Sequence, residues 1–237
     1  MKKKKILISA LISIFVLLVA CYGLFLISKS RTFQFFGEIV ARVDTNEKVV
    51  ALTFDDAPTE YTEPVLKTLK EKQVKATFFA IGSNLEKYPE IGKDIAQQAH
   101  EIGNHSYSHQ RMLLKSQSFI DHEIQKTNTL IRQTGYEGEI FFRPPNGKKL
   151  FGLPWYLYQH GIKTIMVDIE PDTYGNTTDF FVTYTLENTK PGSIILLHPF
   201  CEGCNSQREA ISKIIDGLKA KGYRFVTVSE LLTYKNK

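Results

Sequence analysis

The hydrophobic pattern divides the chain into an apolar N-terminal run and a longer mixed region. The run Ile6–Ile27 holds 22 residues without a charge; four lysines precede it, and Lys29 and Arg31 follow it. A helix of this length spans about 33 Å, the thickness of a bilayer core. The pattern predicts one transmembrane helix, and the lysines before it place the N-terminus inside the cell and the rest of the chain outside.

Two alternative interpretations of this run are secretion and lipidation. A signal peptide usually has a shorter apolar region and a small-x-small cleavage site, and no convincing site follows Ile27. Leu18–Cys21 resembles the lipobox of bacterial lipoproteins, which would be lipidated at Cys21. The apolar run continues for six residues beyond Cys21, which favours an uncleaved anchor.

From residue 47 onward, short β-rich apolar runs alternate with stretches that begin at helix-capping residues. The predicted strands are Val49–Phe54, Ala76–Ile81, Phe141–Phe142, Thr164–Val167, Ser193–Leu197 and Arg224–Val228, with a weaker one around Glu101–Gly103. The predicted helices run from Asn84 to Ala99, from Ser116 to Gly135, from Ser206 to Gly222, and over 150–160 and 179–189. This alternation is typical of an α/β domain with a parallel sheet. We therefore expect an anchor at 1–28, a tether at 29–46 and one domain at 47–237.

Removing the apolar segment changes the charge balance. The whole chain has a formal net charge of +5, but residues 1–31 hold six of its 30 basic residues and none of its 25 acidic ones. The remainder carries 24 basic against 25 acidic residues, a net charge of −1. The basic excess belongs to the membrane segment, so it gives no support for nucleic-acid binding.

The mixed region contains one cysteine pair, Cys201 and Cys204, spaced as C-x-x-C. A single such pair supplies only half of a four-cysteine zinc site, and no second pair completes it. In an exported domain, a local disulfide is the expected state of the two thiols.

Ionisable side chains follow the ends of five predicted strands. The five sets are Asp55 with Asp56; His105 with His109; Arg143; Asp168 with Glu170 and Asp172; and His198. Each set has an ordinary alternative explanation, such as a turn-forming aspartate, a solvated histidine or a residue that caps a strand. Their common position at carboxyl ends is the face on which barrel enzymes build active sites. An open sheet would concentrate its site at one crevice, so five contributing strands favour a closed barrel.

The five segments also resemble the motifs of one family in order. They read TFDDAP, HSYSH, RPPNG, DIEPD and ILLHP, and they resemble the five motifs of the NodB-like polysaccharide deacetylases, carbohydrate esterase family four. The resemblance covers about residues 47–235. It implies a distorted (β/α) barrel with about seven parallel strands, here preceded by one transmembrane helix.

The resemblance implies a role for each matching residue. Asp55 matches the general base, Arg143 the arginine that orients it, and His198 the general acid. The ligands of one divalent metal ion match Asp56, His105 and His109. Zinc is the expected ion, with cobalt, nickel or manganese as alternatives.

The resemblance also bears on further positions, and some of them depart from the family pattern. The backbone N–H of Asn146 matches the donor to the oxyanion. Tyr174 stands in the region of the family's groove tryptophan, and Ala57 replaces the glycine of the first motif. The carboxylate that supports His198 is ambiguous between Glu170 and Asp168.

These implications predict a metal-dependent hydrolase that removes acetyl groups from an N-acetylated glycan and releases acetate. Peptidoglycan amino sugars are the expected substrate, with chitin-like oligosaccharides next. The alternatives are an O-acetyl xylan esterase on the same scaffold and a catalytically inactive carbohydrate-binding surface protein. We expect a monomer whose domain faces the cell exterior.

Overall fold

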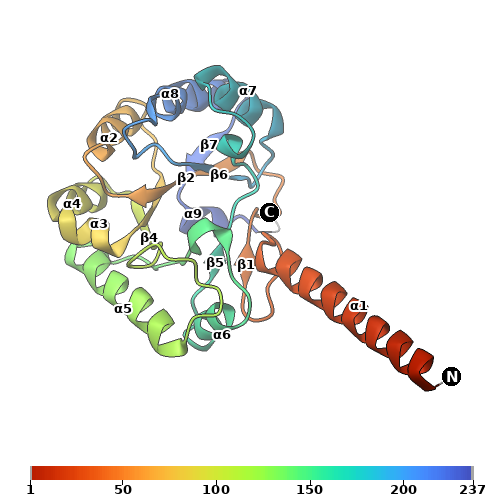
Figure 1. The fold of residues 1–237 in the computed structure, drawn as a ribbon. Coiled ribbons are helices and arrows are strands. Elements are labelled where there is room, and N and C mark those ends of the chain that lie inside the picture. Colours follow the sequence, from red (N-terminus) through yellow and green to blue (C-terminus); the bar gives the residue numbers. More distant parts are fainter. Residues whose placement is uncertain (1, 236–237) are drawn as a thin grey trace.

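One long helix, α1 (Lys2–Ser28), projects from the domain in the computed structural model, which describes residues 2–235 (Figure 1). Its side chains from Ile6 to Leu26 are largely exposed, and its mean hydropathy reaches 2.8. By length and composition α1 can cross a membrane, although a signal sequence passes the same test.

The centre of the domain is strand β2, which pairs in parallel with β3, β6 and β7, while β4 pairs with β3. The short strands β1 and β5 form a separate parallel pair. The strands of residues 2–235 are β1 (Ile39–Val40), β2 (Val49–Ala57), β3 (Thr77–Ala80), β4 (Glu101–Asn104), β5 (Thr164–Ile165), β6 (Ile194–Leu197) and β7 (Arg224–Val226). The predicted α/β fold with a parallel sheet is confirmed.

The predicted closed barrel is not confirmed. Within residues 2–235 no continuous ladder closes the sheet; single bridges at Phe142 link β4 to β5, and another joins Ile169 to Ile195. The ladder is interrupted beyond β5, which has only two paired residues, and the chain after it meets β6 through the single bridge at Ile169. The carboxyl ends of the strands nevertheless gather on one side of the domain.

Helices surround the sheet (Figure 1). They are α2 (Thr62–Glu71), α3 (Gly82–Lys87), α4 (Pro89–Gln97), α5 (Gln117–Gln133), α6 (Gly152–Gln159), α7 (Thr178–Asn188), α8 (Asn205–Ala220) and α9 (Val228–Leu232), with short 3₁₀ turns η1 (Pro145–Gly147) and η2 (Pro171–Thr173). Ser116 caps α5 as predicted, since its side chain accepts a hydrogen bond from the Phe119 N–H. The single helix predicted from Asn84 is wrong: Pro89 restarts the chain as α4, because proline suits a first helical turn but not a helix interior.

Strand β2 is buried on both faces. Val50, Leu52 and Phe54 point toward the core beneath the outer helices, and Val49 and Ala51 point to a second core inside the sheet. The alternation follows from the two-residue period of a strand. Burial on both faces explains the uninterrupted apolar run, and it gives the residues at the end of β2 a rigid support.

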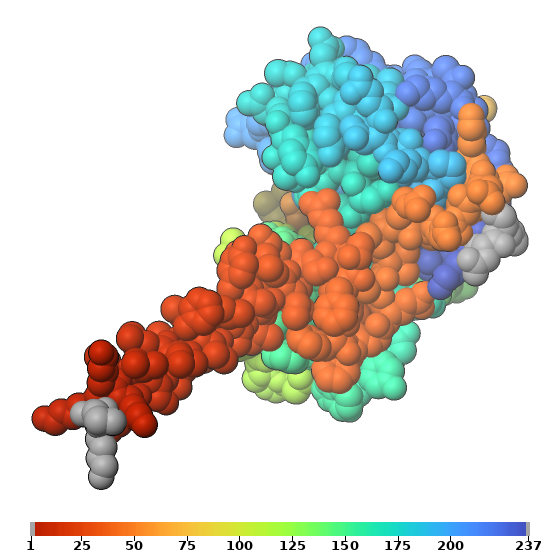
Figure 2. All heavy atoms as spheres, turned by 90° about the vertical axis from the view of Figure 1, so that its right-hand side faces the viewer, coloured from red at the N-terminus to blue at the C-terminus, as the bar shows by residue number. Residues whose placement is uncertain are grey.

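The segment expected to be a tether, residues 29–46, is packed against the domain. Gln34 is buried, β1 pairs with β5, and the Val43 N–H donates to the Gly192 carbonyl. Arg31 forms an ion pair with Glu170. Figure 2 shows this segment lying on the domain directly beside α1. The polar composition of the segment concealed its short two-residue strand.

Candidate active site

A cavity of about 890 Å³ lies at the carboxyl ends of the strands. The predicted site residues that line it are Asp55, Asp56, His105, His109, Arg143, Asn146, Glu170, Tyr174, His198, Cys201 and Cys204. Asp168 and Asp172, from the same predicted set as Glu170, do not line it. Parallel strands end at one edge of the sheet, which is why residues far apart in sequence converge here.

Asp55 is held as a carboxylate at the end of β2. It is buried, and its Oδ1 accepts a hydrogen bond of 2.7 Å from the Arg143 guanidinium. Arg143 also donates to the Thr53 hydroxyl. Burial alone would raise the pKa of Asp55, but the charges of Arg143, His105 and His198 outweigh it and lower that pKa. Asp55 is therefore charged at neutral pH and able to accept a proton.

Asp56, His105 and His109 form a compact donor set beside Asp55. The Oδ1 atom of Asp56 lies 3.8 Å from Nε2 of His105 and 3.4 Å from Nε2 of His109. That Oδ1 is buried, and no hydrogen-bond partner is assigned to it within the described residues. A buried carboxylate oxygen without a donor is costly unless a cation satisfies it.

The surroundings prepare these side chains as metal ligands. Nδ1 of His105 lies 2.8 Å from the Arg143 carbonyl, so an N–H there leaves a lone pair on Nε2, which lies between the carboxylates of Asp55 and Asp56, at 3.5 and 3.8 Å. Burial, followed by the nearby His105, lowers the pKa of His109, which favours the neutral ring that a metal requires. Two nitrogens and one carboxylate fit a hydrolytic zinc site with open positions.

The loop geometry also explains how alanine replaces glycine at residue 57. The positive φ angle falls on Asp56, at 70°, and the ladder between β2 and β3 shifts register between Asp55 and Ala57. Ala57 itself still pairs with Ala80. The bulge places the left-handed backbone conformation at Asp56, so no glycine is required at residue 57.

Asp172 is the carboxylate that contacts His198, which corrects the prediction of Glu170 or Asp168. Its Oδ2 lies 2.6 Å from Nδ1 of His198. Asp168 instead accepts hydrogen bonds from the Ser193 hydroxyl and the Ile194 N–H, and Glu170 pairs with Arg31. The turn η2 begins at Pro171 and brings Asp172 back toward β6, which the spacing of the acidic residues could not indicate.

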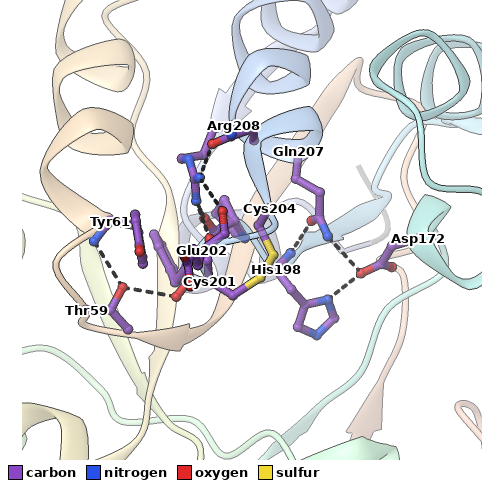
Figure 3. The surroundings of a disulfide bond; sticks show 12 residues. Thr59, Tyr61, Asp172, His198, Cys201, Glu202, Cys204, Gln207 and Arg208 are labelled. Carbon is purple, nitrogen blue, oxygen red and sulfur yellow. Dashed lines mark hydrogen bonds and ion pairs between the residues drawn. A yellow bond between two sulfur atoms is a disulfide. The ribbon is translucent and has the colours of Figure 1, made fainter.

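Gln207 is a site residue that the sequence did not reveal. Its Oε1 accepts the His198 N–H at 2.6 Å, and its Nε2 lies 3.4 Å from Asp172 Oδ2 (Figure 3). Cys201 and Cys204 form the expected disulfide between His198 and α8. The disulfide and Gln207 together tie the histidine loop to the first turn of α8. A glutamine in a helix has no local signature of this role.

The second nitrogen of His198 faces the cavity. Its Nε2 lies 3.9 Å from Asp55 Oδ2. Burial opposes the charged ring, but the hydrogen bond to Asp172 and the charges of Asp55, Asp172 and Asp56 outweigh burial and raise the pKa of His198 to about 9. His198 is therefore protonated at neutral pH and able to donate a proton into the cavity.

We expect the Asp172→Asn variant to shift the alkaline limb of kcat/KM to lower pH. The acid expected from the sequence is protonated His198, so activity should fall as pH rises through its pKa, and removal of a charged partner should lower that pKa. A hydrogen bond to a charged group contributes about 1.5–3 kcal/mol, equivalent to about 1 to 2 pH units. A pH–rate profile measures the shift. The matched control is Asp179→Asn, an exposed aspartate on α7 that should leave the profile unchanged; an unshifted limb in Asp172→Asn would contradict the assignment.

Two further predicted residues lie at the cavity wall. Asn146 has a φ angle of 54°, a left-handed conformation that asparagine tolerates, and its side chain accepts a hydrogen bond from Arg111. It supplies a backbone N–H where Pro144 and Pro145 have none. Tyr174 is exposed, and its ring packs 5.1 Å from that of Tyr184.

Comparison with known proteins places this arrangement in a family. The sequence profile of the polysaccharide deacetylases matches residues 42–165. A peptidoglycan-N-acetylglucosamine deacetylase of Bacillus cereus is 37% identical over 189 residues, which cover 78% of this chain and 69% of that relative. A bifunctional xylanase/deacetylase of Pseudobutyrivibrio xylanivorans is 37% identical over 80% of this chain and 31% of that relative.

A solved structure gives the same result at the level of the fold. The crystal structure of the Bc1960 peptidoglycan N-acetylglucosamine deacetylase matches with a TM-score of 0.77 and 35% identity, over 83% of this chain and 94% of that one. Sequence, fold and the side chains around the cavity agree. The chain belongs to the polysaccharide deacetylase family, the NodB-like enzymes of carbohydrate esterase family four.

Proposed function

We propose that the protein is a metal-dependent N-deacetylase that hydrolyses acetamido groups on peptidoglycan amino sugars and releases acetate. The observation that carries this proposal is the pairing of a charged base with a charged acid in one cavity. Asp55 Oδ2 and His198 Nε2 lie 3.9 Å apart, and the donor set of Asp56, His105 and His109 lies beside them.

The residues divide the reaction between them. Asp56, His105 and His109 would hold the divalent ion, for which zinc is proposed, and the bound ion would supply Lewis-acid polarisation of the acetyl carbonyl. Asp55 accepts a proton from the attacking water, while Arg143 keeps Asp55 charged between turnovers.

The second half of the reaction uses Asn146 and His198, which also line the cavity. The Asn146 N–H donates to the oxyanion that forms when water adds to the acetyl carbon. His198 donates its proton to the sugar nitrogen as the C–N bond breaks, so acetate and a free amine leave. An amine is a poor leaving group as an anion, and a histidine protonated at neutral pH suits that step.

The proposed location is the cell membrane, with α1 as the anchor and the domain outside. The disulfide between Cys201 and Cys204 supports an exported domain. Because residues 29–46 are packed rather than extended, the anchored cavity reaches only glycans close to the membrane. Such a position favours the cell's own wall over distant plant polymers.

A second candidate function is O-acetyl ester hydrolysis on xylan, which the xylanase/deacetylase relative favours. The two functions differ in the leaving group, because an ester releases a hydroxyl that depends less on a protonated His198. An inactive carbohydrate-binding protein is disfavoured, because base, acid and all three proposed ligands are in place.

The substrate is tested with purified full-length protein and three acetylated glycans under one metal and one pH. We expect acetate and new free amines from peptidoglycan fragments, with weaker release from chitooligosaccharides. The measurements are enzymatic acetate detection and fluorescent labelling of amines. Acetate from acetylxylan, with no amine from either amino-sugar polymer, would replace this proposal by the esterase.

A further inference from the structure

Exposed aromatic side chains gather beside the C-terminal end of α1. Outside α1, seven large hydrophobic side chains of the described residues are exposed, and five of them are aromatic residues of two segments, Phe33–Phe36 and Phe151–Tyr158. Those five are Phe33, Phe35, Phe151, Trp155 and Tyr158, with exposed fractions of 36–57%. Together with the half-buried Phe36 we call them the aromatic collar.

Ring contacts join the two segments into one surface. Phe35 stacks on Phe151 with ring centroids 4.4 Å apart, and Phe36 meets Trp155 edge-on at 5.0 Å. Trp155 in turn lies 6.0 Å from Tyr158. These rings leave a contiguous apolar face in solvent, which a soluble surface rarely does without a partner.

The collar is fixed in position relative to α1. Ser28, the last residue of α1, is buried, and its carbonyl accepts a hydrogen bond from the Lys149 N–H. Lys149 also bonds to the Ser30 carbonyl through its ammonium group. The collar therefore begins where the apolar helix ends, as the segment beside α1 in Figure 2 shows.

Two cations lie near Phe25, an aromatic residue in the last turn of α1. The Lys29 ammonium lies 4.7 Å from the Phe25 ring centroid, and that of Lys148 lies 5.8 Å from it. Aromatic rings with lysine or arginine at the end of an apolar span are the composition of a membrane interface, where rings sit among headgroups and cations meet anionic lipid.

We propose that the aromatic collar is a membrane-docking surface that lies among the headgroups of the outer leaflet. The proposal rests on α1 being the anchor proposed above. Lys29 and Arg31, which follow α1, also line the catalytic cavity, so docking would hold the cavity at the membrane surface. A glycan-stacking role is less favoured, because no residue of the collar lines that cavity.

Trp155 makes the proposal directly measurable, because it is the single tryptophan of the chain. The full-length protein is reconstituted in phosphatidylcholine/phosphatidylglycerol vesicles with plain or brominated acyl chains. We expect brominated lipid to reduce Trp155 emission, and we expect the vesicles to protect Trp155 from aqueous acrylamide. A Phe33→Ser/Phe35→Ser/Tyr158→Ser variant should lose both effects.

The matched control moves the reporter to the other side of the domain. Tyr88 lies between α3 and α4, far from α1 in Figure 1, so Trp155→Phe/Tyr88→Trp should be insensitive to brominated lipid and open to acrylamide. If the protein resists carbonate extraction but Trp155 and the control tryptophan respond identically to brominated lipid and acrylamide, the docking proposal fails and the anchor proposal stands. Extraction of the protein from the vesicles by carbonate would refute both the anchor and the docking proposal. It would not affect the proposed deacetylation. A Trp155 response to chitooligosaccharide rather than lipid would assign the collar to glycan binding and overturn docking.

Discussion

The Asp55→Asn variant is expected to lose a factor of about 10² to 10⁴ in kcat while it keeps its metal content. Asparagine preserves the size of the side chain but cannot accept the proton of the attacking water. The proposed ligands Asp56, His105 and His109 are unchanged, so the metal should stay bound. Acetate release measures kcat, and elemental analysis measures the metal.

A second buried carboxylate provides the control for this variant. Glu101 is as buried as Asp55, at 3% exposure each, but it lies at the start of β4 and bonds to Thr77 and Ser229 at the opposite end of the strands. Glu101→Gln should lower thermal stability and keep kcat. Near-full activity in Asp55→Asn would refute its role as base, and an equal loss in Glu101→Gln would trace the effect to folding.

The His105→Ala/His109→Ala variant is expected to lose both bound metal and activity, because it removes two of three proposed ligands. The remaining carboxylate of Asp56 cannot retain a zinc ion alone. In the unaltered protein, metal affinity should fall at acidic pH, since the ligands must be deprotonated. Elemental analysis after dialysis and calorimetric titration with zinc measure these changes independently of turnover.

Another histidine of the same chain controls for the loss of an imidazole. His160 ends α6 with its ring bonded to the Tyr156 carbonyl, and it does not line the cavity. His160→Ala should keep one metal ion per chain. Stoichiometric metal in the His105→Ala/His109→Ala variant would place the metal site elsewhere in the protein.

The sequence could predict that the site residues lie close together, because each of them follows the end of a predicted strand. Asp55, Arg143 and His198 each follow an apolar run, and parallel strands deliver such residues to one edge whatever their separation in sequence. The family motifs then assigned roles that the strand pattern alone left open. Burial of β2 on both faces could likewise be predicted from its continuous apolar run.

Features set by backbone turns could not be predicted in this way. Asp172 reaches His198 only because η2 reverses the chain at Pro171, and a row of alternating acidic residues does not encode that reversal. Gln207 accepts a hydrogen bond from the His198 N–H across the loop that contains the disulfide. The two residues are not close in sequence, so no local motif indicates the contact. The open sheet could not be predicted either, because the pattern indicates a strand over Thr164–Val167 but β5 pairs only over Thr164–Ile165.

Lys149 has a consequence for shedding of the domain from its helix. Its side chain is almost fully buried, and burial, with Lys148 nearby, lowers its pKa to about 8. The Ser30 carbonyl accepts from its ammonium group. A protease that cut between Ser28 and Arg31 would place a new chain terminus beside the buried ammonium group of Lys149. The Ser30 carbonyl would then be held less firmly as its hydrogen-bond acceptor, which would lower the stability of the folded domain. The residues after α1 thus belong to the folded unit, and a released domain would be less stable than the intact chain.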